Sequence, residues 1–497
     1  MTKILYNLFT IKLIAIKLIT NKYKVCNMRR FFDEGRLFEL NSLEKLYGRD
    51  EFTFAVVYGR RRVGKTSIIS EFIRRGSKKA VTFTATEDTN VVNLEIFSQR
   101  VFSVFPNYSM FERFPSWESA FDYIVKQADG EKTIISIDEY PYLAKAHPPI
   151  SSQIQRLIDE VLLKTNMMLI LCGSSMSFME KQVLGYQSPL YGRRTAQYKV
   201  KPLDYYDSAA FFGNAGTEDK LLGYAVSNGI PKYLNVISRP GNVEIGINEE
   251  FFSRDGFLYE EPYNLLKQEL REPAVYNTII ATIANGATKL NVIAAKIAEK
   301  DSKVANYIKN LIDLGILEKE VSMLSGNEKN GIYRVKDGMY RFWYRFVQKL
   351  VTQIDNGDED IYDAKVRPFI PDFMGLAFED ICKQYLLRLN RVKRSPVLFD
   401  SIGRWWGGNP VTKTETEIDV IATSTVEKDI IVGECKWQSK KTGTDVYTDL
   451  KEKAMMFADR KIHYFIFSRS GFTAGLKEES EKDGDLTLVG LEDLFRI

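Results

Sequence analysis

The sequence predicts a multidomain α/β protein, and three observations lead to that class. The chain has 497 residues, about three times the length of a typical domain. Residues 52–66 have the pattern of a short apolar strand, a glycine-rich turn and a helix start, and residues 375–436 that of a helix followed by two strands. With 44% hydrophobic and 27% charged residues, the composition is that of globular domains with packed cores.

The charge and the cysteine content limit which partners, metal sites and catalytic groups we expect. The net charge of +4 is too small to indicate a nucleic-acid partner through bulk electrostatics. The four cysteines form no CxxC pair and the two histidines are isolated, so we expect neither a zinc site nor a disulfide framework, and we expect a cytoplasmic location. Catalysis must then depend on carboxylates, lysines and backbone N–H groups.

Residues 1–27 form a segment of their own, with five lysines, no acidic residue and short apolar runs. The uncharged runs are too short for a membrane span, and lysines interrupt the apolar centre that a signal peptide needs. Two interpretations stay open: a stretch upstream of a true start at Met28, or an amphipathic surface helix. Without these lysines the net charge becomes −1, so DNA contact must come from local patches.

A phosphate-binding motif follows the strand Phe52–Tyr58, where GRRRVGKTS matches GxxxxGK[ST]. The glycines allow successive backbone N–H groups to surround a phosphate, and the helix N-terminus adds its dipole. Lys65 is expected to reach the β- and γ-phosphates, and the Thr66 hydroxyl to hold Mg²⁺. The predicted nucleotide-contacting residues of this loop are Gly59, Arg60, Arg61, Arg62, Val63, Gly64, Lys65, Thr66 and Ser67.

An acidic partner for this motif stands at the end of a second apolar strand, TIISIDEY, over residues 133–140. Asp138 is expected to bind Mg²⁺ through water, and Glu139 to orient and deprotonate the attacking water. The two motifs together predict ATP with Mg²⁺ as ligand and cofactor.

Two further positions are candidates with open alternatives. A third strand over 167–175 ends in Ser174 and Ser175, either of which could contact the γ-phosphate, unless the strand simply runs into a turn. In PLYGRR, Arg193 or Arg194 could stabilise transition-state charge as an arginine finger, and Arg193 is our candidate. A structural salt bridge is an equally good account of one of the two.

This ordered set of motifs, with GRLFELNSL over 35–43 in front, resembles the archaeal-type ATPases of the AAA+/STAND group, although Leu37 stands where an acidic residue is common. The resemblance spans residues 31–350 and includes the NGIPKYL element at 228–234. It implies ATP hydrolysis by a P-loop core over 28–203 and a helical lid over 204–268.

Residues 269–350 have the pattern of successive helices separated by turns, which predicts a winged helix. In its third helix Val304, Ile308, Leu311 and Ile312 form one apolar face, Ser302 is the expected cap and Gly315 ends the helix. The outer face carries two lysines and two asparagines. Docking against the ATPase domain is favoured over contact with DNA phosphates, and both stay open.

Residues 364–497 read as a separate α/β domain. A helix over 375–389 bears Glu379, and the strands TEIDVIA and DIIVGECKW should form an antiparallel hairpin turning near Val426. Asp419 then lies opposite Glu434, and Lys436 lies on the same side as Glu434. Two carboxylates and a lysine predict a Mg²⁺ site, with Glu379 as a further ligand and Lys436 orienting or deprotonating the hydrolytic water.

Together with GRWWGG at 403–408, this set resembles the PD-(D/E)xK nuclease superfamily. The resemblance implies a restriction-endonuclease-like fold and DNA as a partner, and a folded but inactive domain stays open. We therefore expect an ATPase whose nucleotide state controls a nuclease-like domain. The alternatives are a nucleotide-controlled signalling or interaction switch with an inactive nuclease fold, and an ATPase held at a membrane by residues 1–27 without stable insertion. A homo-oligomer stays open.

Overall fold

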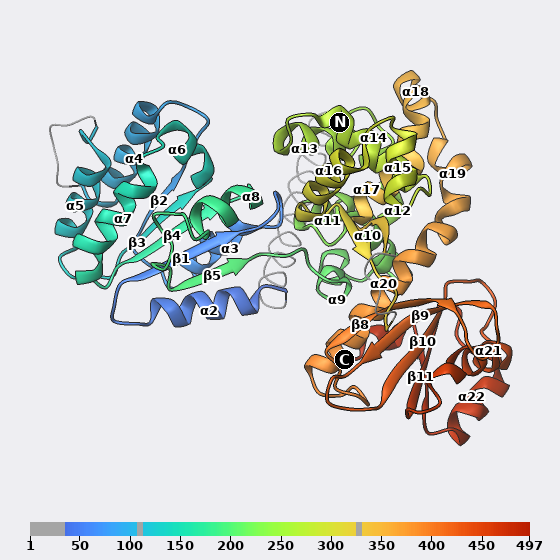
Figure 1. Ribbon diagram of the computed structural model, residues 1–497. Helices are drawn as coiled ribbons and strands as arrows, with labels where there is room; N and C mark the ends of the chain where they lie inside the picture. Colours follow the sequence, from blue (N-terminus) through green and yellow to red (C-terminus); the bar gives the residue numbers. More distant parts are fainter. Residues whose placement is uncertain (1–34, 107–112, 325–330) are drawn as a thin grey trace, which may run out of the picture. The chain divides into compact units, whose positions relative to one another are not determined.

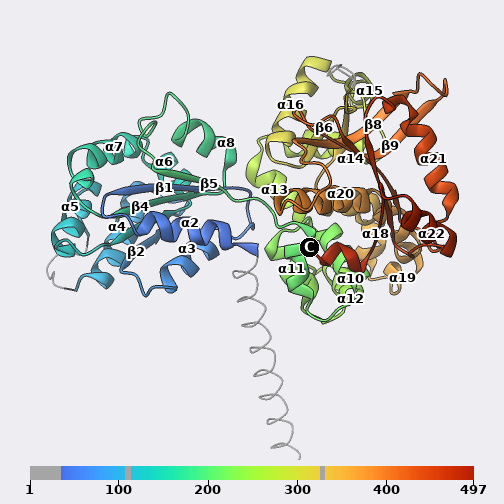
Figure 2. The ribbon, with the colours of Figure 1, turned by 90° about the horizontal axis from the view of Figure 1, so that it is seen from below.

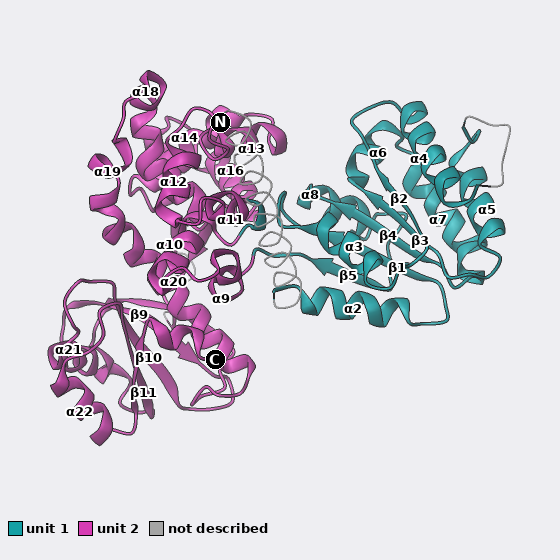
Figure 3. Ribbon diagram, turned by 180° about the vertical axis from the view of Figure 1, so that it is seen from behind, with its two compact units in different colours: residues 1–202, 230–232 teal, residues 203–229, 233–497 magenta. Residues whose placement is uncertain are grey.

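The structure is a computed structural model that describes residues 35–106, 113–324 and 331–497 (Figure 1). The chain divides into two compact units (Figure 3). Unit 1 comprises residues 1–202 and 230–232, and unit 2 comprises 203–229 and 233–497. The expectations for residues 1–27 lie outside the described residues. Within the described ranges, no helix is both long enough and apolar enough to cross a membrane.

Unit 1 is built on a five-stranded parallel sheet with the order β2-β3-β4-β1-β5. The predicted strands are confirmed, because the apolar runs at 52–58, 133–140 and 167–175 form β1, β3 and β4, whose residues are buried throughout. The strands are β1 (Thr53–Tyr58), β2 (Ala80–Thr84), β3 (Ile134–Asp138), β4 (Met168–Gly173) and β5 (Ala196–Lys199).

Helices cover both faces of this sheet, as parallel strands require. Figure 2 shows α2 and α3 on one side and α6, α7 and α8 on the other. Phe54, Val56 and Tyr58 of β1 belong to a core that also contains residues of α4 to α7. The helices are α2 (Leu37–Tyr47), α3 (Lys65–Arg74), α4 (Asn90–Val104), α5 (Trp117–Ala128), α6 (Tyr140–Ala146), α7 (Ile150–Glu160) and α8 (Met176–Phe178).

The first part of unit 2 is helical. Gly229 and Pro231 separate α10 from α11, because α10 ends at Ser227, Gly229 has φ +66°, and α11 begins at Pro231. The helices between the sheet of unit 1 and residue 270 are α9 (Tyr205–Ser208), α10 (Thr217–Ser227), α11 (Pro231–Ser238), α12 (Val243–Phe251) and α13 (Glu261–Glu269).

Three helices and a two-stranded antiparallel sheet follow, in the order expected for residues 269–350. In the third helix Val304, Ile308 and Leu311 are buried as predicted. The prediction that Ser302 caps this helix is wrong, because the helix begins at Asp301 and Ser302 therefore lies inside its first turn. The negative charge of Asp301 in that turn interacts favourably with the helix dipole. The elements are α14 (Pro273–Ala284), α15 (Leu290–Lys296), α16 (Asp301–Asp313), β6 (Leu317–Glu320) and β7 (Ile332–Val335).

The C-terminal part of unit 2 contains a mixed five-stranded sheet with the order β12-β11-β10-β9-β8. Strands β8, β9 and β10 pair antiparallel, and β10, β11 and β12 pair parallel. The elements leading to it and forming it are α17 (Gly338–Phe342), α18 (Gln348–Asn356), α19 (Ile361–Lys365), α20 (Ile370–Arg391), β8 (Ser401–Gly408), β9 (Glu415–Thr423), β10 (Ile430–Lys436), α21 (Thr444–Ala454), β11 (Ile462–Ser468), α22 (Ala474–Lys482) and β12 (Leu486–Gly490).

A cluster of ion pairs around Asp380 joins the hairpin of β6 and β7 to α20. The carboxylate lies 2.8 Å from Arg334 Nη2, 3.2 Å from Lys383 Nζ and 3.5 Å from Arg341 Nη1. Asp380→Ala would leave three positive charges facing one another in a largely buried place. We expect it to lower the free energy of unfolding of unit 2 by about 2–3 kcal/mol, measured by urea denaturation.

Asp372 on the same helix is the matched control. Its side chain is 72% exposed and its carboxylate lies 3.7 Å from Arg345, so Asp372→Ala should cost less than about 0.5 kcal/mol. Equal effects of the two substitutions would contradict a special role for the Asp380 cluster.

Candidate functional site

The loop of residues 59–64 links β1 to α3 at the carboxyl end of the unit 1 sheet. Gly59 is required there, because a side chain at this position would come within 2.3 Å of the carbonyl oxygen of Val200. Gly64 directly precedes α3 with φ +92°, a conformation that glycine adopts without strain. The predicted strand, glycine-rich turn and helix start are therefore present in the order that the motif needs.

Arg36 supports this loop from outside the motif. Its side chain is 4% exposed, and Nη2 donates hydrogen bonds to the carbonyl oxygens of Val63 at 3.0 Å and Lys201 at 2.9 Å. These contacts tie the loop to the segment that follows β5. The sequence drew attention to Arg36 through GRLFELNSL, but it did not indicate a support role.

Lys65 lies folded against its own loop. Its Nζ donates to the carbonyl oxygens of Gly59 at 3.0 Å and Arg60 at 2.9 Å. Burial lowers the pKa of the Lys65 ammonium below its ordinary value, while the neighbouring carboxylates Glu139 and Asp138 act in the opposite direction. A buried ammonium that donates to carbonyl oxygens can still gain from an anionic ligand such as a phosphate.

Thr66 and Asp138 meet although they are 72 residues apart. Thr66 Oγ1 donates to Asp138 Oδ2 at 2.5 Å, which brings together a hydroxyl from the start of α3 and a carboxylate from the end of β3. Hard oxygen donors of these two types are what Mg²⁺ prefers. The pair therefore fits a magnesium ion bound together with phosphate.

Glu139 is held in place by its neighbours. It has φ +50°, a conformation that costs a residue other than glycine roughly 1–3 kcal/mol and often occurs at functional sites. Its Oε2 accepts a hydrogen bond from Ser174 Oγ at 2.8 Å, and its backbone N–H donates to Asp138 Oδ1 at 2.8 Å. Ser174 thus orients the carboxylate from the end of β4. Cys172 is fully buried close by, and burial raises the pKa of its thiol well above the ordinary value.

The remaining predicted residues of unit 1 are placed as follows. Arg61 Nη2 donates to the Tyr142 hydroxyl at 2.8 Å, the Val63 side chain is fully buried, and Ser67 is exposed on α3. Arg193 forms a bidentate ion pair with Asp159 of α7, with Nε–Oδ1 at 2.8 Å and Nη2–Oδ2 at 2.7 Å. This is the salt-bridge alternative, and a role of Arg193 as an arginine finger stays a prediction.

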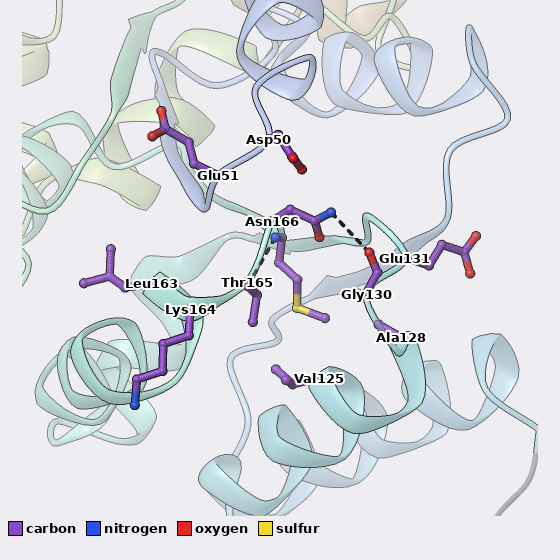
Figure 4. A pocket seen from close by; sticks show the side chains of 11 residues that line it. Asp50, Glu51, Val125, Ala128, Gly130, Glu131, Leu163, Lys164, Thr165 and Asn166 are labelled. Atoms are coloured by element: carbon purple, nitrogen blue, oxygen red, sulfur yellow. Dashed lines mark hydrogen bonds between the residues drawn. The ribbon is translucent and has the colours of Figure 1, made fainter.

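Unit 1 also has a pocket of about 520 Å³, which lies away from the loop of residues 59–64 (Figure 4). It is lined by residues that precede β1, β3 and β4, among them Glu51, Glu131 and Met167. Because the strands are parallel, these residues lie at the amino ends of the strands, opposite the edge that carries the loop of 59–64. The pocket is not part of the predicted nucleotide site.

The second candidate site is in the C-terminal sheet, where the predicted register is confirmed. Strands β9 and β10 pair antiparallel with Gly433 opposite Val420 and Val432 opposite Ile421, so the next pair in register is Glu434 and Asp419. Glu434 is 4% exposed, and its Oε1 lies 2.6 Å from Lys436 Nζ. The backbone N–H of Cys435 donates to Asp419 Oδ2 at 2.8 Å.

Two cations that the sequence did not single out reach this site. Lys453 of α21 lies 3.4 Å from Glu434 Oε2. Arg404 of β8 lies 3.3 Å from Glu379 Oε2 and also pairs with Glu417. Pairing between β8 and β9 shifts by one residue between Gly403 and Trp405, beside Asp419, and such irregularities re-aim side chains.

The predicted set of three carboxylate ligands does not form. Among the described residues, no three His, Cys, Asp or Glu side chains are grouped so that they could hold a metal ion. Asp419 and Glu434 come together and are suitable oxygen donors for Mg²⁺, and Glu379 lies near both Asp419 and the Arg404 guanidinium. Burial, and next the charge of Asp419, raise the pKa of Glu379 to about 7. Burial and the charge of Glu434 likewise raise the pKa of Asp419.

Comparisons with known proteins bear on the part of the chain that contains the first site. Residues 31–237 match a family model described as an ATPase domain predominantly from Archaea, and residues 343–448 match one described as archaeal and bacterial proteins of unknown function. The uncharacterized protein MJECL04 of Methanocaldococcus jannaschii is 32% identical over 460 residues, which cover 92% of this chain and 98% of that protein.

Solved structures are more distant. The Walker-type ATPase paby2304 of Pyrococcus abyssi is 20% identical, with a TM-score of 0.49 over 62% of this chain and 95% of that one. The ORC1 protein of Aeropyrum pernix, solved in complex with DNA, is 15% identical, with a TM-score of 0.33 over 64% of this chain and 94% of that one. From the family model and the full-length relative, the chain belongs to the same family as MJECL04 and is a P-loop protein with an ATPase domain of the type found predominantly in Archaea.

Proposed function

We propose that this protein binds ATP with Mg²⁺ in the loop of residues 59–64 and hydrolyses it. The observation that carries the proposal is the convergence of Lys65, Thr66, Asp138, Glu139 and Ser174 at one end of the parallel sheet. A bound Mg²⁺, held by Thr66 and Asp138, would supply positive charge against the β- and γ-phosphate oxygens.

Each residue of this site has a separate role in the proposed reaction. Backbone N–H groups of the loop and the Lys65 ammonium bind the phosphates and neutralise charge that develops on them. Glu139 orients a water molecule for attack on the γ-phosphorus and accepts its proton. Ser174 keeps the Glu139 carboxylate in position, since its hydroxyl already donates to Oε2.

Glu139→Gln tests the assignment. The amide keeps the shape of the side chain and can still accept from Ser174, but it is a much weaker base. We expect ATP turnover to fall about a hundredfold while ATP affinity changes less than about threefold. Steady-state phosphate release and titration with a fluorescent ATP analogue measure the two quantities.

Glu180→Gln is the control, because Glu180 is a surface carboxylate of the same unit that pairs with Lys199. It should leave turnover unchanged. Turnover that survives Glu139→Gln would show that another group acts as the base.

We further propose that residues 269–350 are a winged helix and that 364–497 are a nuclease-like domain under control of the nucleotide state. Asp419 and Glu434 would hold Mg²⁺, and Lys436 would orient or deprotonate water beside a DNA phosphodiester. The register of β9 and β10 supports this assignment, and DNA cleavage by variants of the two carboxylates tests it. If no cleavage occurs, the function is that of a nucleotide-controlled switch with an inactive nuclease fold.

A further inference from the structure

The lysines of the C-terminal candidate site already have carboxylate partners. Lys436 Nζ lies 2.6 Å from Glu434 Oε1. Lys453 Nζ lies 3.4 Å from Glu434 Oε2 and 2.8 Å from Asp449 Oδ2. An ammonium that neutralises a carboxylate of its own domain attracts an external phosphate less than an unpaired ammonium does. A nucleic acid at this site would therefore need further positive partners.

Arg404 of β8 is occupied in the same way. Its Nη1 lies 3.3 Å from Glu320 Oε2, and its Nε lies 3.3 Å from Glu379 Oε2. Its Nη2 pairs with Glu417 on β9. One guanidinium thus faces carboxylates from three elements of unit 2, and it is not available to a phosphate.

The segment of residues 322–323, which follows β6, lies along β8. The Met323 N–H donates to the Arg404 carbonyl oxygen at 2.8 Å. Ser322 Oγ donates to the Trp406 carbonyl oxygen at 2.7 Å and accepts from the Trp406 N–H at 2.9 Å. The backbone of β8 at residues 404 and 406 therefore also has partners within the protein.

Lys440 and Lys441 differ from these cations. They lie in the loop that follows the carboxyl end of β10, both are exposed, and neither makes an ion pair with a residue that the structure describes. Lys440 follows Lys436 by four residues, which span at most about 14 Å. Because phosphates of one DNA strand follow one another about every 3.4 Å along the axis, both ammonium groups lie within a few phosphates of the site.

Hydrogen bonds fix the backbone on both sides of the two lysines. Ser470 Oγ donates to the Gln438 carbonyl oxygen at 2.6 Å. The N–H of the fully buried Thr442 donates to the Gly471 carbonyl oxygen at 2.9 Å. Residues 439–441 lie between these two anchors, so little backbone entropy remains to be lost when a ligand binds.

We propose that Lys440 and Lys441 bind the phosphate backbone of duplex DNA and position it at the C-terminal candidate site. The inference rests on the proposed nuclease-like function of residues 364–497, and it adds the residues that hold the substrate there. Because the contacts are made to phosphates, they supply affinity without sequence preference.

Binding of a fluorescein-labelled duplex of about 30 base pairs to the full-length protein tests the inference. Fluorescence anisotropy in EDTA, which prevents metal-dependent cleavage, gives the affinity between about 50 and 200 mM KCl. Each phosphate contact adds about 0.9 to the slope of log affinity against log salt concentration. Lys440→Gln combined with Lys441→Gln should therefore reduce the slope by about 2 and weaken binding about tenfold at about 100 mM KCl.

Lys428→Gln combined with Lys482→Gln is the matched control. Both side chains are exposed and make no ion pair with a described residue. Lys428 precedes β10 and Lys482 precedes β12, so both lie toward the amino ends of the parallel strands, away from Lys440. This variant loses the same charge and should change the slope by less than about 0.5.

The two possible failures are distinct. An unchanged slope in the Lys440 and Lys441 variant, or an equal change in both double variants, would overturn the inference. Failure of the natural protein to bind the duplex even at the lowest salt concentration would instead overturn the nuclease-like function on which the inference rests.

Discussion

Lys65→Ala is expected to abolish ATP hydrolysis. The substitution removes a buried ammonium that stands between two carbonyl oxygens and the predicted phosphate position. Interactions of this kind act most strongly on the charge that develops during phosphoryl transfer, and we expect turnover to fall about a thousandfold or more. ATP-dependent release of phosphate at saturating MgATP measures the effect.

The expected loss has to be separated from misfolding. Lys199→Ala is a suitable control, because Lys199 is a half-exposed lysine of the same unit that pairs with Glu180 at 2.8 Å. It should leave turnover within twofold of the natural protein. Thermal unfolding without nucleotide should be similar for both variants, and full activity of Lys65→Ala would show that the phosphate site is misassigned.

Asp419→Ala and Glu434→Ala are each expected to remove DNA cleavage down to the level of a protein-free control. Each change deletes one of two neighbouring oxygen donors, one on β9 and one on β10, and hydrolysis of a phosphodiester at such a site would depend on a cation that they would hold. Gel analysis of DNA incubated with Mg²⁺ or Mn²⁺, with and without ATP, measures the outcome.

Asp429→Ala provides the matched control for this experiment. Asp429 directly precedes β10, at the opposite end of that strand from Glu434. Its Oδ2 lies 3.4 Å from His463 Nε2. Cleavage should be retained in this variant. Cleavage that survives in both Asp419→Ala and Glu434→Ala would indicate a contaminating nuclease.

Local sequence patterns predicted much of this fold. The strands β1, β3 and β4 are continuous apolar runs, and buried parallel strands have that signature. The register of β9 and β10 followed from the position of one turn, because side chains on paired strands meet in a fixed numerical order. Thr66 and Asp138 were both expected at one Mg²⁺ ion, Thr66 from the loop motif and Asp138 from the strand over residues 133–140, and their contact agrees with that expectation.

Contacts set by tertiary packing alone were not predictable in this way. Arg404 and Glu320 are 84 residues apart, and no periodicity or spacing relates them. The same is true of Arg36, whose partner Lys201 is 165 residues away. Glu379 was expected to be a ligand because it lies on the helix before the sheet, but a local pattern could not show that the Arg404 guanidinium also lies 3.3 Å from its carboxylate.

The segment that lies along β8 has a further consequence for the solution behaviour of the C-terminal sheet. A strand at the end of a sheet presents unpaired N–H and C=O groups, and proteins protect such edges against pairing with other chains. Ser322 and Met323 fill part of this role for β8. Residues that precede the C-terminal sheet in the chain therefore cover part of the β8 edge against pairing with other chains, and a fragment of residues 364–497 would lack that cover.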